Sequence, residues 1–131
     1  MGQKVNPNGF RLGVNRTWSS RWFSKSNYAK FLHQDLEIKS YVEKKLKNAS
    51  IAKINIERAA KKIRISIYSS RPGIIIGKKG EEIESLKSSV QKIVNLPAQV
   101  NIKEVRKPDL DATILAEGIA QQLERRVQFR R

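Results

Sequence analysis

Residues 71–86, RPGIIIGKKGEEIESL, contain the arrangement whose chemistry is easiest to name. Gly77 and Gly80 enclose Lys78 and Lys79. Glycines lack a side chain, so their backbone can approach a sugar-phosphate chain closely and adopt unusual dihedral angles. The lysines add mobile cations, and a helix beginning after Gly80 would present N–H groups and a partial positive charge. The spacing therefore predicts a loop that holds a phosphate backbone and does not read bases.

Contacts with bases would come from the apolar residues beside this loop. Ile74, Ile75, Ile76 and Ile83 could line a groove for unstacked bases, and Arg71 is a further candidate RNA contact. A simpler interpretation is a turn between two helices whose lysines are only solvated, because short glycine patterns are common by chance. A nucleotide P-loop is excluded, since only two residues separate the glycines.

The segments before the loop predict one helix and two strands. Apolar residues recur at helical spacing over residues 28–48, with Asp35 as a candidate cap that would bend the run. IAKINIER and IRISIY alternate apolar and polar residues and are separated by a short basic turn, which predicts a β-hairpin. Pro72 suits the first turn of a short helix over residues 72–76.

The segments after the loop predict a helix, a strand and a final helix. Apolar residues from Ile83 to Val94 mark an amphipathic helix with three glutamates in its first turn, where the helix dipole favours acids. AQVNIKEV alternates as a third strand. Asp109 or Asp111 can cap a last helix, whose apolar stripe is Leu110, Ile114, Leu115, Ile119, Leu123 and Val127.

The composition points to a polyanionic partner. Lys and Arg number 27 against 12 Asp and Glu, for a net charge of +15. A domain this basic usually binds nucleic acid, because each neutralised phosphate releases counterions. The absence of cysteine excludes disulfides and thiolate zinc sites. The sequence contains no signal-peptide pattern and no apolar run of about 20 residues, so it gives no indication of a membrane partner.

Residues 1–27 have no period of 2 or 3.6 and predict a basic, irregular arm. Aromatic and basic side chains are mixed in it, so they could stack on RNA bases or pack back on the domain, and both alternatives stay open. The candidate RNA contacts of the arm are Lys4, Arg11, Arg16 and Trp22.

The element order makes the glycine pattern more specific. A Gly-x-x-Gly loop between two helices, preceded by a helix and two strands and followed by a strand, resembles the type II KH RNA-binding domain over residues 28–105. The fold class expected is α+β, with a three-stranded mixed sheet packed on helices. MGQKVNPNGFRLG, RPGIIIGKKGE, and NIKEVRKPDLDA followed by QLERRVQFRR are moreover similar to the bacterial-type S-three family of the small ribosomal subunit, over essentially the whole chain.

This resemblance implies a structural RNA-binding protein in the head of the small subunit. The implied partners are small-subunit rRNA, the ribosomal proteins S-ten and S-fourteen, and mRNA at the entry channel. Arg130 and Arg131, with Arg125 and Arg126 as further candidates, match the basic residues that grip mRNA; a terminal charge pair that is only solvated is the alternative. The implied location is the ribosome in the cytoplasm, of bacterial or organellar type.

The expected domain organisation is an arm (1–27), a KH domain (28–107) and a C-terminal helix (108–131). Members of the family continue into a second α/β domain, so we expect this chain to correspond to their N-terminal portion. The alternative function is a free-standing KH regulator of RNA.

No catalytic arrangement is evident in the sequence. His33 is the only histidine, and it lies in a helical segment without a base, nucleophile or metal-ligand partner at a useful spacing. We therefore expect no enzyme activity, no cofactor, no metal and no small-molecule substrate.

Overall fold

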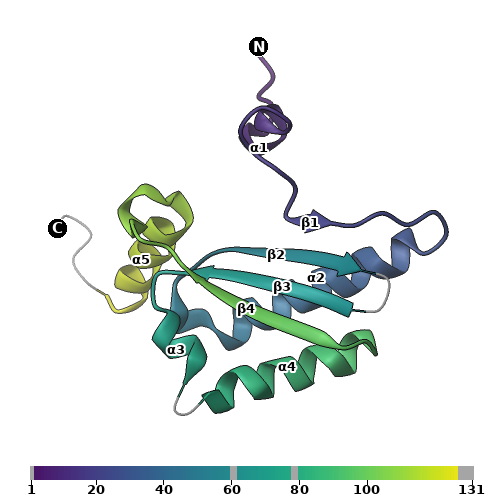
Figure 1. The fold of residues 1–131 in the computed structure, drawn as a ribbon. Coiled ribbons are helices and arrows are strands. Elements are labelled where there is room, and N and C mark those ends of the chain that lie inside the picture. Colours follow the sequence, from purple (N-terminus) through teal and green to yellow (C-terminus); the bar gives the residue numbers. More distant parts are fainter. Residues whose placement is uncertain (1, 60–61, 78–79, 127–131) are drawn as a thin grey trace.

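The computed structural model describes residues 2–59, 62–77 and 80–126. Its sheet has four strands in the order β1-β2-β3-β4: Ser20–Arg21, Ile51–Ala59, Lys62–Ser69 and Ala98–Glu104 (Figure 1). The predicted hairpin is present as the antiparallel pair β2–β3, and β4 lies parallel to β3. The mixed sheet is confirmed, but its expected three strands become four because β1 pairs with β2 in parallel. A two-residue strand is too short to carry a periodic signal.

The helices follow the predicted order closely. They are α1 (Pro7–Arg11), α2 (Tyr28–Lys45), α3 (Pro72–Ile76), α4 (Glu81–Val94) and α5 (Ala112–Glu124), with 3₁₀ turns η1 (Lys47–Ala49) and η3 (Pro108–Leu110). The order α2-β2-β3-α3-α4-β4 is the helix-strand-strand-helix-helix-strand order expected over residues 28–105. Among the described residues, no helix combines the length and the apolar character that a membrane crossing needs.

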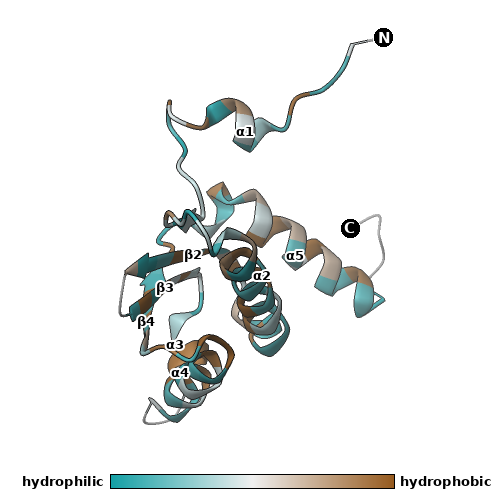
Figure 2. Cartoon of the chain, turned by 90° about the vertical axis from the view of Figure 1, so that its right-hand side faces the viewer, coloured by the Kyte–Doolittle hydropathy of each residue, from teal (hydrophilic) through white to brown (hydrophobic). Residues whose placement is uncertain are grey.

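The core lies between one face of the sheet and the helices α2 and α4. Both helices lie on the same side of β2, β3 and β4, and the opposite face of the sheet carries no helix (Figure 2). Ile38 and Val42 of α2 and Leu86 and Val90 of α4 pack against the inward isoleucines of the strands, which are Ile54, Ile56, Ile63, Ile65 and Ile67. Burial of this apolar surface supplies most of the driving force that holds the loop-bearing helices on the sheet.

The bend expected at Asp35 is wrong. α2 runs unbroken from Tyr28 to Lys45, and Asp35 is a buried residue in its middle with 1% of its surface exposed. A carboxylate this deep needs a partner, and it forms an ion pair of 2.7 Å with Arg58 of β2. Asp35 therefore fixes α2 to the sheet and does not cap a helix.

The N-terminal arm is partly ordered, contrary to the expectation of irregular loops alone. Asn6 caps α1 by accepting hydrogen bonds from the backbone N–H groups of Asn8 and Gly9. In Figures 1 and 2, α1 stands off the domain and is joined to it through β1.

The C-terminal helix α5 is capped by Asp111, one of the two predicted caps. Most of its predicted apolar stripe is exposed: Leu115, Ile119 and Leu123 each show about half of their surface. An ion pair of 3.2 Å between Lys47 and Glu124 ties its end to the domain. Val127 lies outside the described residues.

Candidate nucleic-acid interface

The two glycines of the loop have the backbone geometry that the sequence predicted. α3 ends at Gly77, with φ +68° and ψ −174°, and α4 begins after Gly80, with φ +81° and ψ 8°. Both values of φ are positive, a region that residues with a side chain rarely adopt. Lys78 and Lys79 lie outside the described residues. The described ends of the loop therefore require glycine for conformational reasons.

Gly77 is also required for space. A Cβ atom at Gly77 would lie 2.7 Å from the Cγ atom of Glu82, whereas a Cβ atom at Gly80 would meet nothing within 4 Å. The side chain of Glu82 thus packs on the bare backbone of Gly77, and the first turn of α4 sits directly against the end of α3. We therefore expect this contact to limit how the two helices can move relative to each other at the loop.

The first turn of α4 has a mixed electrostatic character. Gly80 offers no side chain to cap the helix, and the N–H groups of a first helical turn have no partner within their own helix, so they are candidate donors to an anionic ligand. Glu81, Glu82 and Glu84 stabilise the helix dipole, but they would oppose a phosphate placed beside them. A bound phosphate is therefore favoured on the loop side of the helix end, away from these carboxylates.

Lys45 is a cation beside this helix end that the sequence did not single out. Its Nζ atom donates to Ser85 Oγ at 3.0 Å, and with Leu46, Glu81, Glu82 and Ser85 it lines a hollow of about 350 Å³. Its position depends on the packing of α2 against α4, so no local pattern in the sequence signals it.

The predicted apolar floor is only partly correct. Ile74 and Ile76 are each 43% exposed and Ile83 is partly buried, so all three can contact a ligand. Ile75 is 1% exposed and belongs to the core, because successive residues of a helix point in different directions. Ile75 is thus removed from the predicted groove. Arg71 is exposed at the other end of α3.

The candidate residues of the arm lie apart from the loop. Lys4, Arg11 and Arg16 are exposed in or near α1, and Figure 1 shows α1 at the opposite end of the molecule from α3 and α4. Arg125 and Arg126 are exposed at the end of α5, and Arg130 and Arg131 lie outside the described residues. The fold therefore does not gather the predicted contacts into one site.

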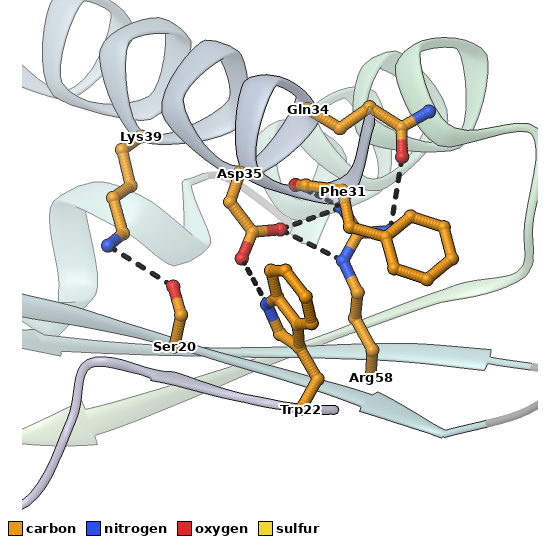
Figure 3. Close-up of polar contacts among 7 residues, drawn as sticks. All are labelled: Ser20, Trp22, Phe31, Gln34, Asp35, Lys39 and Arg58. Atoms are coloured by element: carbon orange, nitrogen blue, oxygen red, sulfur yellow. Dashed lines mark hydrogen bonds and ion pairs between the residues drawn. The ribbon is translucent and has the colours of Figure 1, made fainter. Parts of the chain in front are cut away.

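Trp22 is engaged within the domain (Figure 3). Its Nε1 atom donates to Asp35 Oδ2 at 2.7 Å, and its ring meets Tyr28 and Phe31 with centroid separations of 5.3 and 5.6 Å. Of the two alternatives for the arm aromatics, this geometry favours packing on the domain for Trp22. Trp18, by contrast, is 68% exposed.

Two titratable groups near the helices have shifted pKa values. A hydrogen bond with Ser89 lowers the pKa of Tyr41; burial opposes this shift, and the charge of Lys45 supports it. Burial raises the pKa of Glu117, and the charge of Glu43 adds to the effect. Neither group lies in the loop. Within the described parts of the chain, no group of three or more His, Cys, Asp and Glu side chains could hold a metal ion.

A family model described as "KH domain" matches residues 37–110, which is more than half of the chain. The chain therefore belongs to the KH domain family, as the loop and the order of its elements predicted.

Its relatives are more specific. Small ribosomal subunit protein uS3 of Shewanella loihica is 58% identical over the whole of this chain and 58% of its own length. The proteins of the same name from Geobacter sulfurreducens and Chromobacterium violaceum are each 57% identical over the whole chain, which covers 62% and 57% of their lengths. The resemblance to the S-three family is confirmed, and the chain spans less than two thirds of these relatives.

Proposed function

We propose that this chain is a non-catalytic, structural part of the small ribosomal subunit that binds its rRNA through the loop 77–80. The observation that carries the proposal is the geometry of Gly77 and Gly80. Two glycines with positive φ lie at the junction of α3 and α4, where they present no side chain next to the first turn of α4, a position at which helices commonly bind anions. The name of the relatives supplies the ribosomal context.

The chemistry of the site fits RNA held by its backbone. Ile74, Ile76 and Ile83 provide apolar surface beside the loop for unstacked bases. The net charge of +15 favours association with a folded RNA of high charge density. The arm would contact the same RNA separately, because its cations Lys4, Arg11 and Arg16 are exposed at a distance from the loop.

The finer assignments follow from the resemblance. The chain would lie in the head of the subunit beside S-ten and S-fourteen, in the cytoplasm. Arg130 and Arg131, with Arg125 and Arg126, would contact mRNA near the entry channel. The alternative is a free-standing KH regulator, which would bind RNA without joining the subunit.

Co-sedimentation of the tagged chain with small subunits tests the ribosomal assignment. The chain should sediment with the subunits at stoichiometric level and remain there at moderate salt. A chain that binds RNA but stays in the supernatant would support the free-standing regulator. Incubation of RNA with the pure chain should leave the RNA uncut; a magnesium-dependent cleavage lost in a single point variant would contradict the non-catalytic assignment.

The loop is tested with the double variant Lys78→Asp/Lys79→Asp. Because the loop would hold backbone, its binding should weaken to a similar degree for every RNA sequence. If it neutralises about four phosphates, the log–log salt slope of the unaltered chain contains a contribution of about −3 from this site. Lys30→Asp/Lys44→Asp, which makes the same charge change on exposed positions of α2, is the matched control. Equal losses of RNA affinity in the two variants would assign the effect to net charge and refute phosphate binding by the loop.

A further inference from the structure

The face of the sheet that the helices leave open carries a regular pattern of side chains. Along β2 and β3 the buried isoleucines alternate with residues that point to the other face. The strand register aligns these outward residues in three rows across the sheet. The rows are Lys53–Tyr68–Lys103, Asn55–Ser66–Asn101 and Arg21–Glu57–Arg64–Gln99.

The first row places an aromatic ring between two cations. The Nζ atoms of Lys53 and Lys103 lie 4.5 and 5.4 Å from the ring centroid of Tyr68, and Lys103 Nζ also donates to the tyrosine hydroxyl at 3.4 Å. Tyr68 is partly exposed, and both lysines are exposed. A ring that can stack on a base, next to ammonium groups that can bind its phosphates, is the combination found in sites for single-stranded nucleic acid.

The other two rows extend this chemistry along the strands. Asn55 and Asn101 offer amide groups that can donate to and accept from base edges, whereas Ser66 between them is buried, with 8% of its surface exposed. Beyond them, Arg21, Glu57, Arg58, Ala59, Lys62 and Arg64 line a hollow of about 250 Å³. Glu57 lies 3.9 Å from Arg21 and 3.5 Å from Arg64, so one carboxylate is shared between two guanidinium groups.

The charge of this face points to a polyanion. The described outward residues of the strands include five cations (Arg21, Lys53, Lys62, Arg64 and Lys103) and one carboxylate, Glu57. The large apolar residues that are exposed in the described chain all lie outside β1–β4. A protein partner would therefore find little apolar surface to bury here, whereas a nucleic acid would find complementary charge.

We propose that the open face of the sheet is a second RNA-binding surface, separate from the loop 77–80, which takes a single-stranded segment. A base stacks on Tyr68, while Lys53 and Lys103 bind the adjoining phosphates and Asn55 and Asn101 contact base edges. The inference rests on the proposed function in that the partner is RNA, but it assigns that RNA to different residues.

Substitution of Tyr68 tests the stacking contact, with a fluorescein-labelled U12 RNA and an abasic strand of the same length as probes. Tyr68→Leu should weaken binding of U12 by about 5- to 150-fold, the range of one lost base–aromatic stack. Tyr68→Phe keeps the ring and should bind within about twofold of the unaltered chain. Neither change should affect the abasic strand, which has phosphates and no bases. Equal affinity of the Leu and Phe variants for U12 would overturn the proposal.

Substitution of the lysines tests the phosphate contacts. Lys53→Gln/Lys103→Gln removes two phosphate partners and should reduce the log–log salt slope by about 1.4 for a single strand. Lys30→Gln/Lys44→Gln on α2 removes the same charge from the side of the molecule that faces away from this surface, and it should leave the slope unchanged. Thermal unfolding of each variant establishes that the fold is retained.

The same measurements in the Lys78→Asp/Lys79→Asp background separate this inference from the proposed function. If Lys78→Asp/Lys79→Asp loses affinity for RNA and the Tyr68 and Lys53/Lys103 variants do not, RNA binding by the loop is supported and the second surface is refuted. If only the sheet variants lose affinity, the proposed loop function fails and the second surface stands. Sheet variants that bind U12 normally but no longer co-sediment with small subunits would assign the surface to a protein and also overturn the proposal.

Discussion

Removing one partner of the ion pair between Asp35 and Arg58 should be among the most destabilising single substitutions in the domain. Asp35 is 1% exposed, and its two oxygens accept three hydrogen bonds: from Trp22 Nε1 at 2.7 Å, from Arg58 Nε at 3.0 Å and from Arg58 Nη2 at 2.7 Å (Figure 3). The side chain of Arg58 is 6% exposed. Asp35→Ala would leave this guanidinium buried, and its remaining acceptors among the described residues would be Gln34 Oε1 and Phe31 O.

The expected cost follows from that isolation. Removing one partner of a buried ion pair costs about 3–5 kcal/mol, because the remaining charge stays desolvated. Domains of this size are stable by about 5–15 kcal/mol, so Asp35→Ala should remove a large share of the total. Asp35→Asn should lower the free energy of unfolding by less than Asp35→Ala does. Its carbonyl can still accept from Arg58, but its NH₂ group would face the N–H group of Trp22.

Urea unfolding followed by far-UV circular dichroism measures these differences. The double variant Asp35→Leu/Arg58→Met removes both charges and should cost less than the sum of the single variants. Glu124→Ala is the control, because it breaks an exposed ion pair: the side chains of Lys47 and Glu124 are 68% and 62% exposed. It should lower the free energy of unfolding by at most about 1 kcal/mol. A loss below about 1 kcal/mol for Asp35→Ala, or additive costs in the double variant, would refute the argument.

Two smaller effects should be measurable in the C-terminal helix. Burial and the nearby Glu43 raise the pKa of Glu117 above its ordinary value of 4.5. The folded chain therefore holds the proton of the Glu117 carboxyl group more tightly than the unfolded chain does. The contribution of this group to stability falls as the pH rises from 4.5 through the raised pKa of the folded chain. Glu117→Gln should therefore stabilise the chain at pH 7 by up to about 0.5 kcal/mol, with no gain at pH 3; a gain that is the same at both pH values would contradict the assignment. Asp111→Ala removes the cap that accepts from Thr113 N and Ile114 N at 3.0 and 3.3 Å, and should cost about 1 kcal/mol and speed hydrogen exchange of those amides; unchanged exchange would contradict the cap.

The sequence predicted well where local chemistry decides the structure. Pro72 and Gly77 delimit α3 at the predicted residues, because proline favours the first turn of a helix and glycine allows the conformation that ends it. The alternating isoleucines likewise predicted β2 and β3 as a hairpin, since a period of two with one buried face specifies the register.

The sequence predicted poorly where contacts between distant residues decide. Asp35 looked like a helix cap because its partner, Arg58, is 23 residues away in another element. Ile75 could not be distinguished from Ile74 and Ile76, because three consecutive isoleucines have no period and only the packing of α3 decides which one is buried. The rows on the open face were missed for the same reason, since they exist only once the register of β2, β3 and β4 is known.

The two glycines of the loop should differ in how strictly they are required. At Gly80 an alanine meets no atom within 4 Å, so Gly80→Ala should cost only the strain of the left-handed conformation, about 1–2 kcal/mol. At Gly77, φ +68° with ψ −174° is a region almost exclusive to glycine, and the new Cβ atom would overlap the side chain of Glu82.

Gly77→Ala should therefore destabilise the chain more than Gly80→Ala in urea unfolding, and it should also weaken RNA binding more, because relief of the overlap requires α4 to move away from α3. Gly77→Ala/Glu82→Ala distinguishes the two causes. It shortens the overlapping side chain and should recover part of the loss, while the backbone strain remains. Full recovery would show that the dihedral angle costs little, and no difference between the two alanine variants would show that the contact with Glu82 does not fix the loop.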